Sequence, residues 1–272
     1  MTPTRFRVLQ HFARKRNNLS YREMLAFFFA PSYSAKAKRI INRTEQGIPF
    51  NKVFFKNDPR PLYYPASFPY LSLQQVVCEC FYPDNWHFYE VPETRVRPDD
   101  TVVDCGAAEG LFGFLVADRC KKLYLVEPVK DFCNALALTF ESQDNVEILQ
   151  VAVSSEDGVA TISENNISSS ITQNGTGARI QVARLDALFF DKNIPVSYIK
   201  IDLEGFDYDA LRGAENLIRA NKPRIAVTTY HKKEHAAQIE AYLKGIVPEY
   251  KIFTKGIYQE TGSPVMLHAW VD

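Results

Sequence analysis

From residue 101 onward, apolar runs of strand length alternate along the chain with segments that have helical spacing. We expect strands at 101–105, 122–126, 146–153, 197–203 and 224–229, and helices at 109–119, 130–143, 207–220 and 233–243. Such alternation predicts a parallel α/β sheet with helices on both faces.

Further strands are expected outside this alternation. Short strands at 159–162 and 180–185 are expected to flank a polar loop, 163–179. Two final strands, 250–254 and 265–270, bracket a turn with Gly and Pro, and are expected to form an antiparallel hairpin.

The first 98 residues lack this alternation, so we expect an appendage over 1–98 and a domain over 99–272. Residues 1–45 carry ten Arg or Lys against two Glu, with apolar residues between them at helical intervals. A basic amphipathic segment of this kind suits an anionic membrane surface or an anionic substrate. The alternative is packing on a neighbouring element, or a homodimer contact, with the basic face in water.

Residues 46–100 are rich in proline and aromatic residues, and one helix is expected at 71–81. Such a segment, placed before a nucleotide-binding core, often forms a lid or an acceptor pocket. An ordinary aromatic core is the alternative.

The composition excludes several classes of protein. Lys plus Arg and Asp plus Glu both number 32, so the net charge is zero and no nucleic-acid partner is indicated. The five cysteines show neither zinc-finger spacing nor a paired pattern, which suits a reducing compartment. Because neither a membrane-length apolar run nor a signal peptide is recognisable, we expect a cytoplasmic protein, peripheral to a membrane at most.

The most informative stretch is VVDCGAAEGLF, residues 102–112. A buried strand ends at Asp104, and Gly106 and Gly110 in the following turn let a ligand approach the backbone. The helix that follows directs its free N–H groups to this turn. The next strand ends in Glu127, a carboxylate placed to accept hydrogen bonds from two ribose hydroxyls. This layout predicts a nucleoside site at the carboxyl end of a parallel sheet.

The turn DCGAAEG lacks the G-x-G-x-x-G pattern of a dinucleotide site. Asp104 and Glu109 would repel a pyrophosphate, whereas S-adenosylmethionine carries a sulfonium and an ammonium group. An antiparallel seventh strand is also typical of class I methyltransferases, whereas a nicotinamide-binding sheet more often adds a second βαβαβ half. The sequence therefore favours S-adenosylmethionine over NAD.

The stretch YIKIDLEG, residues 198–205, places Lys200, Asp202 and Glu204 on one face of a strand. A lysine in a central parallel strand must be paired, because burying an isolated charge is costly. Asp202 and Glu204 are open to two interpretations, as partners of Lys200 or as groups that face the ligand. His231 follows the next strand and is expected at the same edge of the sheet.

Residues 101–254 resemble the FkbM-type family of S-adenosylmethionine-dependent methyltransferases. The matching segments are VVDCGAAEGLFGF, LYLVEP, VEILQVAVSSEDG, VARLDALF, YIKIDLEGFDYDALRGAENLI and TTYHKKEHAAQIEAYL. The resemblance implies a class I, Rossmann-like seven-stranded sheet and methyl transfer to a hydroxyl of a sugar, glycan or small natural product. Many members carry Asn-Ile or a similar pair where this chain has Ala108-Glu109.

The resemblance also implies the site residues. The methionine part of the cofactor is expected near Asp104, Gly106 and Gly110, the ribose at Glu127, and the adenine between Pro128, Ala152 and Val153. Ala107, Glu109 and Asp202 complete the expected cofactor-binding set, and Asp202, Glu204 and His231 are expected to face the acceptor.

A hydroxyl acceptor must lose its proton as it attacks the methyl group. A histidine with an ordinary pKa near ~6.5 suits this role, so His231 is the expected base, and Asp202 either orients it or is the base itself. A divalent metal on Asp202 and Glu204 would instead acidify the hydroxyl. The rival functions are a catalytically silent binding or scaffold protein and an NAD-dependent oxidoreductase.

Overall fold

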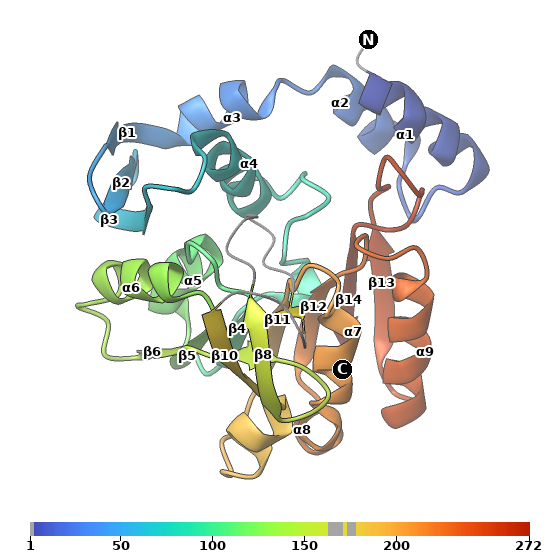
Figure 1. Cartoon of the computed structure of the whole chain (residues 1–272). Coiled ribbons are helices and arrows are strands. Elements are labelled where there is room, and N and C mark those ends of the chain that lie inside the picture. Colours follow the sequence, from blue (N-terminus) through green and yellow to red (C-terminus); the bar gives the residue numbers. More distant parts are fainter. Residues whose placement is uncertain (1–2, 163–170, 173–177) are drawn as a thin grey trace.

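The computed structural model describes residues 3–162, 171–172 and 178–272. Its centre is a seven-stranded sheet with the order β13-β14-β12-β11-β4-β5-β6 (Figure 1). The strands are β4 (Thr101–Cys105), β5 (Lys122–Val126), β6 (Val146–Leu149), β11 (Tyr198–Ile201), β12 (Arg224–Thr228), β13 (Lys251–Lys255) and β14 (Met266–Trp270). Neighbouring strands are parallel except that β14 is antiparallel to both β12 and β13. The expected class I sheet with its C-terminal antiparallel hairpin is confirmed.

Alternate residues of the strands contribute to two separate cores. Val102 and Leu123 belong to one buried cluster, and their neighbours Val103 and Tyr124 belong to the other. Strands buried on both faces are typical of parallel sheets with helices on each side. The first cluster includes residues of α5 (Leu111–Val116) and α6 (Lys130–Thr139). The second includes residues of α7 (Asp207–Arg212), α8 (Glu215–Asn221) and α9 (His235–Ile246).

The strand expected at 146–153 is divided between two sheets. After β6 the chain turns, with the Val151 N–H donating to the Leu149 carbonyl at 3.0 Å. β7 (Ala152–Val153) then joins a second sheet of order β7-β10-β8-β9, with β8 (Gly158–Ile162), β9 (Ile171–Thr172) and β10 (Ala178–Ala183). Most of the polar loop expected at 163–179 lies outside the described residues.

The helix expected at 207–220 is interrupted at Gly213. A Cβ on Gly213 would lie 2.1 Å from the Ser154 carbonyl oxygen, so another segment approaches the backbone there. The Asp186 carboxylate then accepts the N–H groups of Asn216 and Leu217, which begins α8 as a new helix. Asp186 itself opens a short π-helix, Asp186–Phe190, that the periodicity did not predict.

Residues 3–65 form three helices and a three-stranded antiparallel meander. The elements are α1 (Pro3–Arg14), α2 (Tyr21–Phe29), α3 (Tyr33–Ile40), β1 (Ile41–Glu45), β2 (Phe50–Phe55) and β3 (Asp58–Pro65). The sequence did not predict this sheet. Pro59 and Pro61 are accommodated because β3 is an edge strand that pairs only with β2.

α4 (Tyr70–Phe81) confirms the helix expected at 71–81. Val53, Leu62 and Val77 pack into the same cluster as Val102 and Leu111, so the N-terminal elements share a core with the large sheet. The division at residue 98 stays a prediction. Within the described part of the chain, the helices are too short and too polar to cross a bilayer.

Candidate functional site

A cavity of about 300 Å³ opens at the carboxyl ends of β4, β5 and β11. Among the residues singled out from the sequence, those that line it are Gly106, Ala107, Glu109, Glu127, Pro128, Ala152, Val153, Asp202, Glu204 and, at its base, Lys200. Asp104, Gly110 and His231 do not line it. Residues that lie far apart in the sequence thus line one cavity. This is expected, because the carboxyl ends of parallel strands meet at the same edge of a sheet.

Below the cavity, Lys200 and Asp104 form a buried ion pair. They occupy paired positions on β11 and β4, and the Lys200 Nζ lies 2.9 Å from Asp104 Oδ1. Burial disfavours the ammonium, but Asp104 and Asp202 outweigh this and hold the pKa of Lys200 above its ordinary value. The expected pairing of Lys200 is therefore present, with Asp104 rather than Glu204 in contact. Asp104 supports the cavity from beneath instead of lining it.

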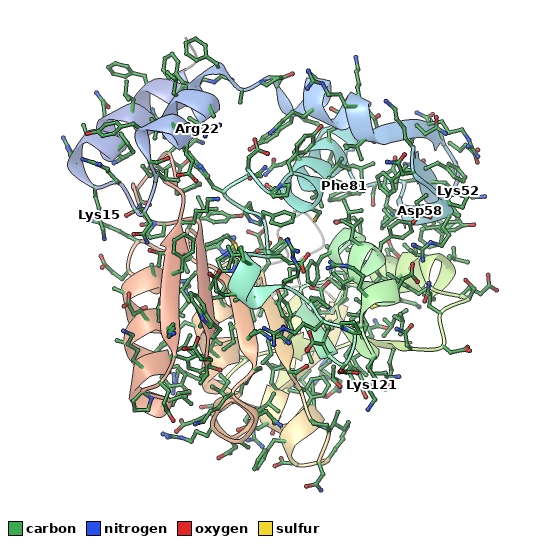
Figure 2. The ribbon with its side chains drawn as sticks, turned by 180° about the vertical axis from the view of Figure 1, so that it is seen from behind. Lys15, Arg22, Lys52, Asp58, Phe81 and Lys121 are labelled. Carbon is green, nitrogen blue, oxygen red and sulfur yellow. The ribbon has the colours of Figure 1, made fainter. Side chains whose placement is uncertain are left out.

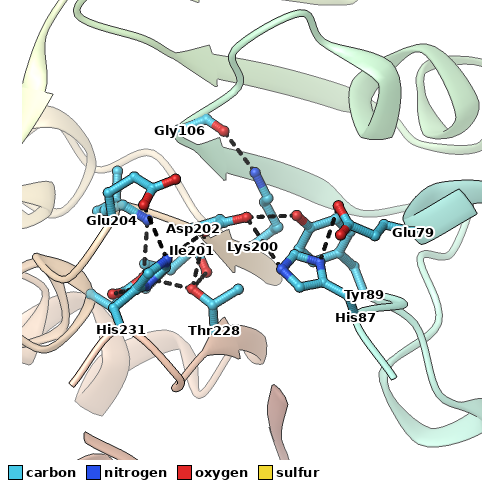
Figure 3. Close-up of polar contacts among 12 residues, drawn as sticks. Glu79, His87, Tyr89, Gly106, Lys200, Ile201, Asp202, Glu204, Thr228 and His231 are labelled. Atoms are coloured by element: carbon cyan, nitrogen blue, oxygen red, sulfur yellow. Dashed lines mark hydrogen bonds and ion pairs between the residues drawn. The ribbon is translucent and has the colours of Figure 1, made fainter. Parts of the chain in front are cut away.

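The glycine turn after β4 is held in a conformation that favours glycine. Gly106 has φ +77°, and a Cβ there would lie 2.0 Å from the Asp202 carbonyl oxygen. Its own carbonyl accepts a hydrogen bond from Lys200 Nζ at 2.7 Å (Figure 3). Gly110 has φ +80°, and its missing side chain leaves room for Leu136, so Gly110 serves packing behind the cavity wall.

Glu127 bridges two backbone segments at the end of β5. Its Oε2 accepts the Ala108 N–H and its Oε1 accepts the Val129 N–H, both at 2.9 Å. Burial raises the pKa of Glu127 to about 7, although these N–H groups and Lys200 favour the charged form. Each oxygen keeps a second lone pair for a hydroxyl donor in the cavity.

The cavity wall is acidic. It carries five carboxyl groups: Glu79, Glu109, Glu127, Asp202 and Glu204. Lys200 is committed to Asp104 and Gly106. Burial also raises the pKa of Glu109 to about 7, although backbone N–H groups and Lys200 favour its charged form. The site therefore suits a ligand that carries positive charge.

Asp202 lies at the centre of the polar contacts in Figure 3. Its Oδ2 accepts the Tyr89 hydroxyl at 2.8 Å. Its Oδ1 lies 3.2 Å from the Thr228 hydroxyl, whose single proton has a closer acceptor in Asp207 at 2.8 Å. Burial alone would raise the pKa of Asp202, but His87, Lys200 and His231 lower it below the ordinary value. Asp202 is thus an ionised carboxylate that reaches the cavity.

His231 lies behind Asp202, among three carboxylates. Its Nδ1 is 3.2 Å from Asp207 Oδ2, and its Nε2 is 3.4 Å from Glu204 Oε2 and 3.9 Å from Asp202 Oδ1. Burial disfavours the imidazolium, but these groups outweigh it and raise the pKa of His231 to about 10. The sequence analysis assumed an ordinary histidine pKa, and the surrounding carboxylates instead keep His231 protonated at neutral pH.

Ligand atoms of Asp202, Asp207 and His231 lie within 4.8 Å of one another, which is close enough to hold a metal ion. Asp207, however, is fully buried and accepts hydrogen bonds from the Leu203 and Gly205 N–H groups and from the Thr228 hydroxyl. Its lone pairs are used in holding this turn.

The sequence analysis missed three groups on the opposite wall. Tyr89 donates to Asp202, and His87 lies between carboxylates, with Nδ1 3.8 Å from Glu79 Oε2 and Nε2 3.8 Å from Asp202 Oδ2. Glu79 comes from α4, and the other two come from the segment between α4 and β4. A proline-rich segment has no periodicity that shows which side chains face inward, so only the general expectation of a lid or pocket was available.

The residues present fit S-adenosylmethionine. Gly106 and Ala107 line the cavity, Glu127 retains acceptor capacity for ribose hydroxyls, and the carboxylates suit the cationic methionine end. Pro128, Ala152 and Val153 give the cavity an apolar section for a base. The same carboxylates oppose the pyrophosphate of a dinucleotide.

The sheet has one reversed strand, β14, beside β12, and the cavity lies at the carboxyl ends of β4 and β5. Together these features define a class I methyltransferase fold. Comparison with protein-family models matches residues 104–250 to the "Methyltransferase FkbM domain". This match covers more than half of the chain, and the chain therefore belongs to the FkbM methyltransferase family.

Among solved structures, the chain is similar to methyltransferase FkbM from Methylobacillus flagellatus KT, with 16% identity and a TM-score of 0.51. That similarity covers 92% of this chain and 62% of the other, so this chain spans less than two thirds of that relative. An rRNA methylase from Streptococcus thermophilus gives 15% identity and a TM-score of 0.42, covering 65% and 89% of the two chains. The protein SMU.1697c from Streptococcus mutans, solved in complex with SAH, gives 10% identity and a TM-score of 0.41. This similarity covers 64% of this chain and 90% of the other. The search of curated proteins found no match.

The surroundings of His231 predict a pH-dependent contribution to stability. A folded-state pKa of about 10, above the ordinary value of 6.5, means that the contribution is complete below pH 6.5 and is lost as the pH rises through 10. His231→Gln should therefore lower the free energy of unfolding by roughly 1–3 kcal/mol at pH 6, and by much less above pH 10. Urea titrations across this range measure the difference.

His268→Gln is the matched control, because burial lowers the pKa of His268 to about 3 and leaves it neutral throughout this range. The decrease in the free energy of unfolding caused by His268→Gln should stay nearly constant between pH 8 and pH 10. An equal cost of His231→Gln at pH 6 and above pH 10 would contradict a charged His231.

Proposed function

We propose that this chain is an S-adenosylmethionine-dependent methyltransferase that methylates a hydroxyl of a sugar, glycan or small natural product. The observation that carries the proposal is the acidic cavity at the strand ends, where Glu127 and the ionised Asp202 both reach one hollow. The carboxylates favour a sulfonium nucleoside, and Asp202 favours an acceptor that must release a proton.

In this proposal, Glu127 binds the ribose hydroxyls, and Pro128, Ala152 and Val153 enclose the adenine. The backbone at Gly106 and Ala107 holds the methionine part, with Glu109 facing its ammonium group. The cofactor supplies an electrophilic methyl group. The protein then needs chiefly to position the acceptor oxygen and to exclude water.

Asp202 is the proposed proton acceptor, one of the two possibilities left open by the sequence. His231 is already protonated, so it acts as a positioning residue that keeps Asp202 ionised, together with His87 and Lys200. The Tyr89 hydroxyl donates to Oδ2 of Asp202 and so fixes its orientation.

The charges that line the cavity also narrow the range of acceptor molecules that fit it. Glu79, Asp202 and Glu204 line the cavity together with Glu127, so a phosphorylated or sulfated acceptor would meet like charge. A neutral polyol fits better, because its hydroxyls can donate to these carboxylates.

Two alternative functions predict different results for cofactor binding and turnover. A binding or scaffold protein with this fold would bind S-adenosylhomocysteine, the reaction product, without turnover. An NAD-dependent oxidoreductase would bind NAD, which the acidic turn disfavours. The cofactor and turnover measurements below separate the three.

The ribose role of Glu127 can be tested by calorimetry with S-adenosylhomocysteine. Glu127→Ala should weaken binding by ~30-fold or more, because a carboxylate–hydroxyl pair of hydrogen bonds contributes roughly 2–4 kcal/mol. Wild-type affinity should also fall as the pH drops below about 7, where Glu127 takes up a proton.

Glu249→Ala serves as the control, since Glu249 is paired with Lys222 on the surface outside the cavity. Equal affinities of the wild type and Glu127→Ala for S-adenosylhomocysteine would show that Glu127 does not bind the ribose. Tighter binding of NAD than of S-adenosylhomocysteine would contradict the cofactor assignment.

The role of Asp202 can be tested by following S-adenosylhomocysteine release with a panel of simple glycosides. Asp202→Asn should lower turnover by ~10²–10⁴-fold, the usual contribution of general acid–base catalysis. His231→Gln should lower it less, and should shift the pH profile, because its charge acts through Asp202.

Addition of EDTA to the wild type separates the proton-acceptor role from a metal role. We expect unchanged turnover, because Asp207 is engaged in hydrogen bonds and does not complete a ligand set. Turnover that is lost with EDTA and restored by Mg²⁺ would assign Asp202 to a metal instead.

A further inference from the structure

The helices α1 and α2 bury only their inner faces. Val8 and Phe12 of α1 and Met24 of α2 pack with Leu19 and Ile257 in a small cluster of their own. Asn17, between the two helices, donates hydrogen bonds to the Gly256 and Gly262 carbonyls beyond β13. Figure 1 shows the two helices beside that end of the sheet. Their position is therefore fixed by the inner face alone.

The outer face of α2 carries a stripe of large apolar side chains. Tyr21, Leu25 and Phe29 recur at four-residue intervals and are 67%, 61% and 74% exposed. On α1, Phe6 and Leu9 are 51% and 38% exposed. Isolated exposed apolar residues are common, but a contiguous set on neighbouring helices marks an interaction surface.

Basic side chains surround this stripe. The exposed ones on and between the two helices are Arg7, Arg14, Lys15, Arg16 and Arg22, of which Lys15 and Arg22 are labelled in Figure 2. Glu23 is the single acidic residue between positions 3 and 44. Its carboxylate is engaged with Ser20 in a capping box and lies 3.6 Å from Lys255. The surface is thus apolar and cationic, with its one carboxylate neutralised.

The surface is already formed before any partner binds. Ser20 caps α2, and the Arg5 guanidinium donates to the Phe28 and Ala30 carbonyls, which ties α1 to the end of α2. Docking would therefore not require these helices to fold first, and the conformational cost of binding is low.

We propose that the outer face of α1 and α2 docks on an anionic lipid bilayer. Helices that lie in the membrane interface combine exposed Phe, Leu and Tyr with Lys and Arg, and exposed residues of both kinds are present on and between α1 and α2. The bilayer interior would take up the apolar stripe, and anionic headgroups would meet the basic side chains. A second copy of the chain fits poorly, because a two-fold contact would place this cationic surface against itself.

Docking would also bring the bilayer close to the cavity wall. Phe27 of α2 stacks on Trp86 with ring centroids 4.4 Å apart, and Trp86 is followed directly by His87, which lines the cavity. The surface inference does not depend on the proposed function, since it rests on α1 and α2 alone.

The test is flotation of the full chain with vesicles of phosphatidylcholine containing about one third phosphatidylglycerol, against pure phosphatidylcholine. We expect binding to the anionic vesicles, decreasing with added salt because surface charges are screened. Leu25→Ser/Phe29→Ser should weaken binding by ~10-fold or more, since two large apolar side chains no longer insert. Arg14→Gln/Arg16→Gln/Arg22→Gln should weaken it and flatten its salt dependence.

Leu138→Ser/Val159→Ser is the matched control, because it removes two partly exposed apolar side chains from α6 and β8. It should bind like the wild type. Absence of wild-type binding to the anionic vesicles, or an equal loss in the control, would overturn the proposal. So would a wild-type dimer that Leu25→Ser/Phe29→Ser converts to a monomer without any vesicle binding, measured by light scattering.

Discussion

The ion pair between Lys200 and Asp104 is the interaction on which the site depends. It joins the two central strands, β11 and β4, and Lys200 also donates to the Gly106 carbonyl, which fixes the glycine turn. The ammonium lies 5.0 Å from the ring centre of Tyr89, whose hydroxyl holds Asp202. One buried cation therefore connects the sheet, the turn and the N-terminal segment.

Burying such a pair is costly unless its remaining polar atoms are satisfied. Lys200 has a second acceptor in the Gly106 carbonyl, within the functional turn, so the stability of the pair and the shape of the cavity are coupled. Asp104 Oδ2 is buried and has no hydrogen-bond partner among the described residues. Glu109 and Glu127 are desolvated in the cavity wall, and Lys200 and backbone N–H groups offset this cost only in part. A cationic nucleoside would relieve this, which is the physical basis of the cofactor assignment.

Local periodicity was enough to predict the large sheet. β4, β5, β11 and β12 are short apolar runs followed by turn residues, and strand ends of a parallel sheet meet at one edge, which brought Glu127 and Asp202 together. The need to pair Lys200 also followed from burial, whereas its partner depended on strand register and turned out to be Asp104.

Other features depend on contacts that no local pattern encodes. The helix break at Gly213 follows from the approach of Ser154, and the placement of His87 follows from how a proline-rich segment crosses the cavity. The protonation of His231 depends on Asp207, whose side chain folds back under its own turn. A tabulated pKa for histidine could not anticipate three nearby carboxylates.

A crystal structure of the chain grown with S-adenosylhomocysteine tests the central claim most directly. The account predicts the nucleoside in the cavity above Lys200, with its ribose hydroxyls on Glu127, its amino acid end beside Gly106 and its sulfur on the side of Asp202. A nucleoside bound elsewhere, or one in the cavity whose ribose makes no contact with Glu127, would contradict it.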